Sequence, residues 1–170
     1  PIGHATRDIE PGQWVHTHNL ATNLTGAAAY TYHPDFQTLT PKSTGSFQGY
    51  LRPDGRAAIR NEIWILPTVG CVNGVAQKLA NDNQSLVRDN IDGLYAFPHP
   101  FGCSQLGDDH ENTKRVLSAL AQHPNAGGVL VLGLGCENNT MEQFREGLGA
   151  WNPDRVKFLV CQDTTDELAE

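Results

Sequence analysis

Apolar runs alternate with amphipathic stretches along most of this chain, from Phe47 to its last residues. The runs have the length and composition of buried strands, and the stretches between them have helical spacing. We expect strands at 63–66, 93–97, 129–132 and 156–161, and helices at 72–80, 111–122 and 141–148. Because strand and helix alternate, the pattern predicts a parallel sheet with right-handed crossovers. Apolar runs such as 128–134 do not alternate, which indicates helices on both faces and a three-layer α/β domain.

The first 46 residues lack this alternation. Residues 1–30 contain short β-like runs broken by Gly and Pro, and residues 13–19 alternate as a strand would. Residues 31–46 are rich in Thr, Pro and Ser without periodicity, which is typical of a linker. Two further runs, 47–52 and 57–66, flank a Pro-Asp-Gly turn and predict a hairpin. The sequence therefore predicts a small β module at 1–30, a linker at 31–46 and an α/β domain at 47–170.

Composition narrows the classes of partner. The net charge is −7, and the twelve Lys and Arg residues are scattered, so nucleic acid is not an expected partner. No apolar run approaches the roughly 20 residues that a membrane helix needs, so no membrane partner is expected either. Four cysteines in 170 residues are far too few for a disulfide scaffold and indicate reduced thiols in a cytoplasmic protein.

Three cysteines follow expected strands and are each preceded by a glycine: Cys71, Cys103 and Cys136. In parallel α/β sheets, ligands bind beyond the carboxyl ends of the strands, where all three fall. Cys71 and Cys136 are also expected to open helices, whose dipole stabilises a thiolate. A single cysteine in such a place is usually a small core residue, but three equivalent ones predict a reactive or metal-binding centre. Cys161 also ends an expected strand. Two alternatives have equal weight for this residue: packing in the core and a place in the site.

Three thiols from separate loops suit an iron–sulfur cluster with one open iron, a ferrous site or a thiolate-rich zinc site. The residues by themselves leave these alternatives open. Redox disulfide chemistry is less favoured, because no two of the cysteines are close in sequence.

Three histidines are candidates for proton transfer. His16 and His18 are two apart in an expected strand, so both side chains project from one face and suit metal ligation or acid–base work. The alternative is the polar face of an edge strand. His99 shares a loop with Cys103, where it could ligate, move a proton or satisfy a loop hydrogen bond.

Residues beside the strand that leads to Cys71 are candidates for binding a substrate. Arg60 carries a guanidinium fork that matches a carboxylate, and the alternative is an ordinary exposed strand residue. The predicted substrate-binding residues are Arg60, Asn61 and Asn73.

The chain resembles the sugar-acid dehydratases typified by altronate dehydratase and galactarate dehydratase. The resemblance runs in order through IGHAT at 2–6, WVHTHNL at 14–20, FQGY at 47–50, RPDGR at 52–56, IRNE at 59–62, PTVGCVN at 67–73, HPFGC at 99–103 and GLGCE at 133–137. It implies that residues 1–30 are the C-terminal half of a β-clip module of the SAF type. It also implies that 47–170 are the N-terminal portion of the dehydratase domain, with a large further region absent.

The activity implied is that of a hydro-lyase in hexuronate catabolism. Loss of water from a hexonate or hexarate gives a 2-keto-3-deoxy sugar acid. The implied cofactor is iron, as Fe²⁺ or alternatively an iron–sulfur cluster, held or bordered by the three cysteines, while the histidines move protons. The expected partner is a small-molecule sugar acid, with a homo-oligomer as an open alternative.

Other readings of the same resemblance stay open. The chain could belong to a sibling lyase such as galactarate dehydratase or sulfolactate sulfo-lyase, or be a non-catalytic binding or assembly fragment. A structural zinc site is a further alternative. Such a fragment need not be active alone.

Overall fold

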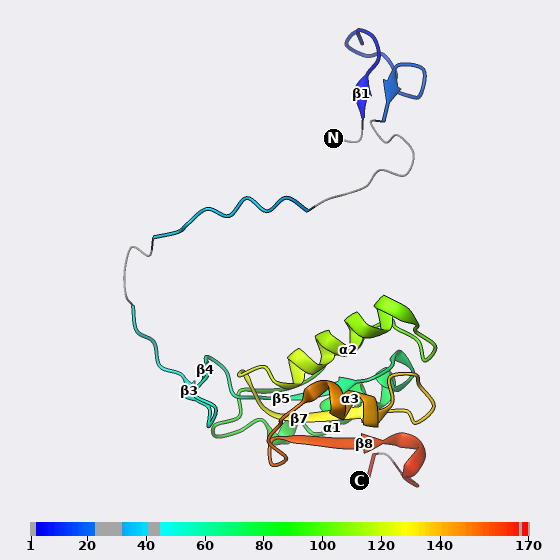
Figure 1. The fold of residues 1–170 in the computed structure, drawn as a ribbon. Coiled ribbons are helices and arrows are strands. Elements are labelled where there is room, and N and C mark those ends of the chain that lie inside the picture. Colours follow the sequence, from blue (N-terminus) through cyan, green and yellow to red (C-terminus); the bar gives the residue numbers. More distant parts are fainter. Residues whose placement is uncertain (1–2, 23–31, 41–44, 167, 170) are drawn as a thin grey trace. The chain divides into compact units, whose positions relative to one another are not determined.

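The computed structural model describes residues 3–22, 32–40, 45–166 and 168–169. The chain forms two compact units, Pro1–Thr44 and Gly45–Glu170, which are traced in Figure 1. Among the described residues, the larger sheet and the three α-helices belong to the second unit (Figure 1). In the part of the chain that the structure describes, none of the helices has the length and apolar character needed to cross a membrane.

Four parallel strands form the sheet of the second unit, in the order β6-β5-β7-β8. They span Glu62–Pro67 (β5), Gly93–Ala96 (β6), Ala126–Gly133 (β7) and Val156–Val160 (β8). In the central register Ile65 lies beside Ala96 on one side and Leu130 on the other. Because the strands are parallel, all four carboxyl ends reach the same edge of the sheet. The predicted parallel α/β fold is confirmed.

Helices cover both faces of this sheet. Helix α1 (Asn73–Asp82) packs on one face over β5 and β6, and α2 (Gly107–Ala121) and α3 (Met141–Leu148) pack on the other (Figure 1). Successive residues of β5 alternate between the two cores, with Trp64 and Leu66 on the α2 side and Ile65 on the α1 side. Burial on both faces explains why the strands read as continuous apolar runs.

A short hairpin precedes the sheet. Strand β3 (Tyr50–Leu51) pairs antiparallel with β4 (Ala57–Ala58), so the predicted hairpin is confirmed in a shorter form. The apolar run 57–66 is divided between β4 and β5. Helix α2 begins four residues before the predicted start at 111, with Asp108 and Asp109 in its first turn, where carboxylates interact favourably with the helix dipole.

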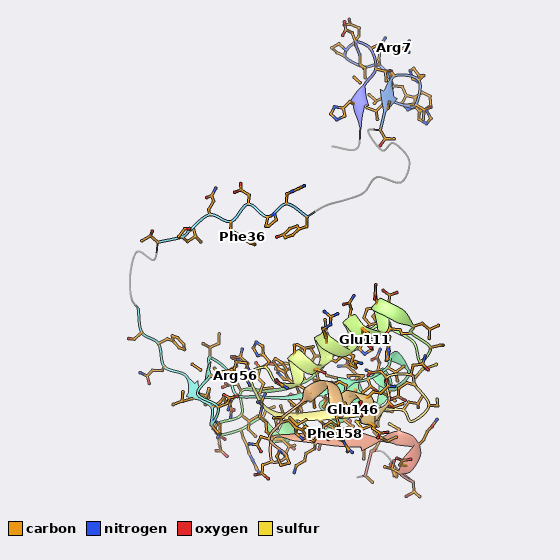
Figure 2. The ribbon with its side chains drawn as sticks, in the orientation of Figure 1. Arg7, Phe36, Arg56, Glu111, Glu146 and Phe158 are labelled. Carbon is orange, nitrogen blue, oxygen red and sulfur yellow. The ribbon has the colours of Figure 1, made fainter. Side chains whose placement is uncertain are left out.

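In the described part of the first unit, β1 (His4–Ala5) pairs with β2 (Leu20–Ala21). The strand expected at 13–19 was wrong: residues 16–19 form a turn, in which the Asn19 N–H donates to the His16 carbonyl at 2.9 Å. Residues 32–40 contain no helix or strand, and the side chain of Phe36, labelled in Figure 2, is 82% exposed. Part of the expected linker, residues 31 and 41–44, and part of the expected β module, residues 1–2 and 23–30, lie outside the described residues.

Candidate functional site

Three turns that carry cysteines lie at the carboxyl edge of the sheet, which we call the cysteine edge. They are residues 67–73 after β5, 97–106 after β6 and 133–140 after β7. Cys71 lies in a 3₁₀ turn (Gly70–Val72) that leads into α1, and Cys103 and Cys136 lie in turns without helical structure. The prediction that parallel topology collects these three cysteines at one edge is confirmed.

The 97–106 turn is hydrogen-bonded to the 67–73 turn. The Gly70 N–H donates to the Phe101 carbonyl at 2.7 Å, and the Asn73 side-chain amide donates to the His99 carbonyl at 2.8 Å. A Cβ atom at Gly70 would lie only 2.9 Å from the His99 oxygen and 3.0 Å from the Phe101 oxygen. The close approach of the two backbones therefore requires glycine at this position.

Asn138 connects the 97–106 turn to the third turn. Its backbone N–H donates to the Cys103 carbonyl at 2.8 Å, and its side-chain amide donates to the Gln105 carbonyl at 3.0 Å. The turn that contains Cys103 is thus bonded to both of the others. The cysteine edge is one connected backbone network, although its three thiols come from positions more than thirty residues apart.

Glu137 organises the turn that contains Cys136. Its carboxylate accepts hydrogen bonds from the Thr68 hydroxyl at 2.6 Å and from the N–H groups of Leu134 and Gly135 at 3.0 and 2.6 Å. Only 4% of the residue is exposed. Burial alone would raise the pKa of this carboxyl, but the hydrogen bonds from Thr68 and the neighbouring backbone outweigh burial and lower the pKa. The group is therefore an ionised acceptor inside the turn.

The thiols differ in their surroundings. Cys71 and Cys136 are exposed, whereas Cys103 is half-buried and packs against the α1-side core. The Gln162 side-chain amide lies 3.8 Å from the Cys136 sulfur. The expectation that Cys136 opens a helix was wrong, because α3 begins at Met141 behind a Thr140 N-cap. The first residue of α3 therefore lies five positions beyond Cys136.

The cysteine edge offers thiol donors, which suit iron and zinc. All four cysteines are among the described residues and form no disulfide. Within the described ranges, no three His, Cys, Asp or Glu side chains form a group that could hold a metal ion. The thiols fit iron in chemical type and lie at one edge, but the described residues do not bring three donors together as a ligand set. The metal-ligand assignment stays a prediction.

His99 has both ring nitrogens engaged with the backbone. Nε2 lies 3.0 Å from the Pro67 carbonyl, which can only accept, so Nε2 carries the proton. Nδ1 then accepts the Phe101 N–H at 3.3 Å. These contacts make His99 a link between the 97–106 turn and the end of β5, and they leave neither nitrogen free for the predicted proton transfer.

Arg60 and Asn61 precede β5 and therefore lie at the amino edge of the sheet, opposite the cysteine edge. Arg60 donates to the Glu62 carboxylate at 2.8 Å, and the Asn61 side chain accepts from Arg52 at 2.8 Å and donates to the Asn90 carbonyl at 2.6 Å. The structure separates these two predicted substrate-binding residues from the thiols, because a strand delivers residues before and after it to opposite edges. Asn73 alone of the three lies at the cysteine edge.

His16 and His18 lie in the turn of the first unit. Asn19, which is 2% exposed, accepts the His16 N–H and donates to the Trp14 carbonyl, both at 2.9 Å. The Trp14 ring stacks on His16 at a centroid distance of 4.5 Å and is tilted against His18 at 6.0 Å. The two imidazoles are thus brought together by a turn and a tryptophan, rather than by the strand periodicity that suggested them. Both residues are exposed.

A groove of about 570 Å³ lies beside His99, between the 97–106 turn and α2. Its walls are mostly apolar and include Phe97, Phe101, Val116 and Leu120. Such walls offer few hydrogen-bond partners for a hydroxylated ligand, and we do not assign the groove to a substrate.

Sequence reasoning missed Thr68 and Gln162, and it left Glu137 either as a carboxylate for the site or as part of a first helical turn. The signal for Glu137 was its position directly after Cys136. Neither of the other two carries a local signal, because their partners lie 69 and 26 positions away.

Comparison with known proteins identifies the family. Residues 49–170 match the model described as D-galactarate dehydratase/Altronate hydrolase, second domain. This chain belongs to that family. The resemblance inferred from the sequence motifs is therefore confirmed, and the second-domain match covers the sheet, its helices and the whole cysteine edge.

Curated relatives extend the match across both units. The chain is 50% identical over 171 residues to the altronate dehydratase of Escherichia coli (strain K12) and 49% identical over 174 residues to that of Bacillus subtilis (strain 168). Both alignments cover 99% of this chain and 34% of the relative, so the chain spans about a third of their length. The beta subunit of (2R)-sulfolactate sulfo-lyase from Chromohalobacter salexigens is 37% identical over 89 residues, which cover 52% of this chain and 21% of that protein. The SAF-type assignment of residues 1–30 stays a prediction.

Proposed function

We propose that this chain is part of a hydro-lyase that removes water from altronate or a closely related sugar acid. The observation that carries the proposal is the near-complete alignment of both units, at about half identity, with two proteins named altronate dehydratase. The product would be a 2-keto-3-deoxy acid. The activity belongs to the longer protein, of which these residues supply the cysteine edge and the His16 turn.

The reaction sets out what the residues must do. A base removes the proton α to the carboxylate, and the β-hydroxyl leaves as water with a second proton. The resulting enol then tautomerises to the keto acid. Negative charge develops on the substrate carboxylate during the first step and must be stabilised by groups that are already in place.

The thiols support a metal-assisted form of this reaction. Cys71, Cys103 and Cys136 would hold or border iron, together with ligands from elsewhere in the longer protein, and the bound iron would supply a Lewis acid for the developing charge. The 97–106 turn would keep the three thiols in one network through Asn73 and Asn138.

His16 and His18 are the proposed proton carriers, because His99 has no free ring nitrogen. The stacked Trp14 ring favours one orientation of the His16 imidazole, which suits a proton carrier. The buried Asn19 side chain fixes the turn that carries both histidines and thereby helps to orient them.

Metal analysis of the longer protein, prepared without oxygen, tests the iron assignment. We expect iron content and visible absorption to fall in Cys71→Ser, Cys103→Ser and Cys136→Ser variants. Cys161→Ser, at the same edge but after β8, tests whether the fourth cysteine belongs to the site or to the core. Retention of iron and activity after all three cysteines become serine would refute the assignment. Zinc in place of iron would favour a structural site.

Product assays test the reaction itself. The longer protein is expected to convert altronate to its keto-deoxy acid and to lose that activity in the His16→Ala, His18→Ala double variant. Full activity in the double variant would make the first unit a binding or assembly module. The similarity to a sulfolactate sulfo-lyase subunit makes sulfolactate the second substrate to assay, and release of sulfite without dehydration of altronate or galactarate would favour that alternative.

A further inference from the structure

The Glu137 carboxylate spans two of the three turns of the cysteine edge. Oε1 accepts the Thr68 hydroxyl, which belongs to the turn after β5, and also the Leu134 N–H of the turn after β7. Oε2 accepts the Gly135 N–H, one residue before Cys136. One side chain thus joins the segment that leads to Cys71 with the segment that holds Cys136, across a sequence separation of 69 residues.

The chemistry of this arrangement requires a carboxylate. Both oxygens face donors, and an ionised carboxylate is the side-chain group that accepts on both of its ends. An amide of the same shape would place its NH₂ group against either the Gly135 N–H or the Thr68 and Leu134 donors. Because 96% of the residue is shielded from solvent, water could not replace a lost partner without cost.

Besides the Glu137 bonds, this turn is held by Asn138, which donates to the Cys103 and Gln105 carbonyls, and by the Gln162 N–H, which donates to the Leu134 carbonyl at 3.0 Å. Residues 134–139 have no helical or strand structure, and Gly135 has φ of +125°, a backbone conformation open mainly to glycine. Cys136 itself is exposed, and the contact described for its thiol is with Gln162 at 3.8 Å. The position of the Cys136 sulfur is therefore set by the backbone around it, and the carboxylate joins that backbone to the Thr68 hydroxyl of the Cys71 turn.

We propose that Glu137 is a positioning residue that, with the Thr68 hydroxyl, fixes the Cys136 turn against the Cys71 turn so that the two thiols act as one site. It acts through the backbone and does not itself contact the ligand of the thiols. The metal-binding test of this proposal rests on the proposed function. The cross-linking test does not depend on that function.

Two substitutions separate the parts of this link. Glu137→Gln removes one acceptor oxygen and keeps the volume of the side chain. Thr68→Val removes the hydroxyl donor, and the carboxylate keeps its bonds from the Leu134 and Gly135 N–H groups. Thr68→Ser keeps the hydroxyl and is the conservative rescue. Glu62→Gln is the matched control, because Glu62 also accepts a side-chain donor, the Trp64 indole at 2.8 Å, but lies at the amino edge of the sheet. Far-UV circular dichroism establishes that each variant is folded.

The first readout is Co²⁺ binding by the longer protein, followed by thiolate-to-cobalt absorption. Groups that orient metal ligands typically change metal affinity by about 10- to 100-fold when they are removed. We expect a loss of that size in Glu137→Gln and Thr68→Val, and wild-type affinity in Thr68→Ser and Glu62→Gln.

The second readout is the yield of a Cys71–Cys136 cross-link, formed in the 170-residue chain by a short bis-maleimide and identified by peptide mass spectrometry. We expect Glu137→Gln and Thr68→Val to lower this yield severalfold, because they loosen the link between the two turns. Thr68→Ser and Glu62→Gln are expected to leave the yield unchanged. If Cys71→Ser and Cys136→Ser leave Co²⁺ binding intact, the proposed metal function fails and the cross-link alone decides. Wild-type cross-link yields in both Glu137→Gln and Thr68→Val would overturn the positioning role.

Discussion

Replacing Gly70 by alanine tests how tightly the cysteine edge is built. An ideal Cβ atom at this position lies 2.9 Å from the His99 oxygen and 3.0 Å from the Phe101 oxygen, and both oxygens belong to the backbone. They cannot rotate away as the end of a long side chain would. The 97–106 turn must therefore move, and the bond from the Gly70 N–H to the Phe101 carbonyl, 2.7 Å long, must lengthen.

The magnitude follows from these two effects. Overpacking a close contact costs about 1–3 kcal/mol, and a weakened backbone hydrogen bond adds about 1 kcal/mol. We expect Gly70→Ala to lower the free energy of unfolding by about 2–4 kcal/mol on these grounds.

The other two Gly–Cys pairs supply internal comparisons. Gly135 has φ of +125°, and a Cβ atom there would lie 2.8 Å from the Gln162 side-chain oxygen, which can rotate away, and 3.0 Å from the Gln162 Cβ, which cannot. Backbone strain alone predicts a loss of about 1–3 kcal/mol for Gly135→Ala. Gly102 has open space around its ideal Cβ and no positive φ. Gly102→Ala should therefore change stability by less than about 0.5 kcal/mol.

Urea unfolding of the 170-residue chain, followed by tryptophan fluorescence, measures all three variants. Trp64 is 6% exposed in the second unit, whereas Trp14 in the first unit is already 72% exposed, so the signal reports chiefly the sheet. An equal loss in Gly102→Ala and Gly70→Ala, or a loss below about 0.5 kcal/mol for Gly70→Ala, would refute the reasoning from close backbone approach.

Further substitutions test the core, the end of α2 and the first unit. Phe144→Ala empties a fully buried position and should lower unfolding free energy by about 3–5 kcal/mol, whereas Phe36→Ala, at an exposed position, should change it by less than about 0.5 kcal/mol in the same urea assay. Arg155→Met removes guanidinium bonds to three carbonyls at and after the end of α2 and should cost about 2 kcal/mol in thermal unfolding. Arg56→Met, which removes an exposed ion pair, should cost less than about 1 kcal/mol, and equal losses for the two arginines would contradict this account. Asn19→Ala removes both side-chain bonds of the turn at residues 16–19 and should speed amide exchange over residues 14–20, measured by NMR; unchanged protection would show that the backbone bonds alone hold the turn.

Much of the second unit follows from local pattern. Apolar runs that lack alternation, such as the one around Val131, identify strands buried on both faces, and helical spacing between them indicates parallel crossovers. Once the strands are parallel, residues that follow them must share an edge. The common placement of Cys71, Cys103 and Cys136 was therefore within reach of the sequence, and so was the family, through the motifs around these cysteines.

Local pattern failed where a single side chain overrode periodicity. Residues 13–19 alternate like a strand, yet the buried Asn19 amide closes them into a turn, because one residue with two backbone partners can outweigh a weak preference for extended backbone. The helix predicted at 141–148 is confirmed, but the expectation that Cys136 itself opens a helix failed for a similar reason. The Glu137 carboxylate takes up the Leu134 and Gly135 N–H groups, and the helix begins only at the Thr140 cap.

The sequence by itself determined the parallel α/β class, the hairpin, the family and the edge at which three cysteines gather. Only the tertiary structure decided the strand order β6-β5-β7-β8, the separation of Arg60 and Asn61 from the thiols, the engagement of both His99 nitrogens and the link between Thr68 and Glu137. The physical reason is the sequence separation over which each kind of interaction acts. Periodicity and turn chemistry act within about ten residues and leave a readable pattern in the chain. Hydrogen bonds between distant segments depend on how the strands assemble and leave no such pattern.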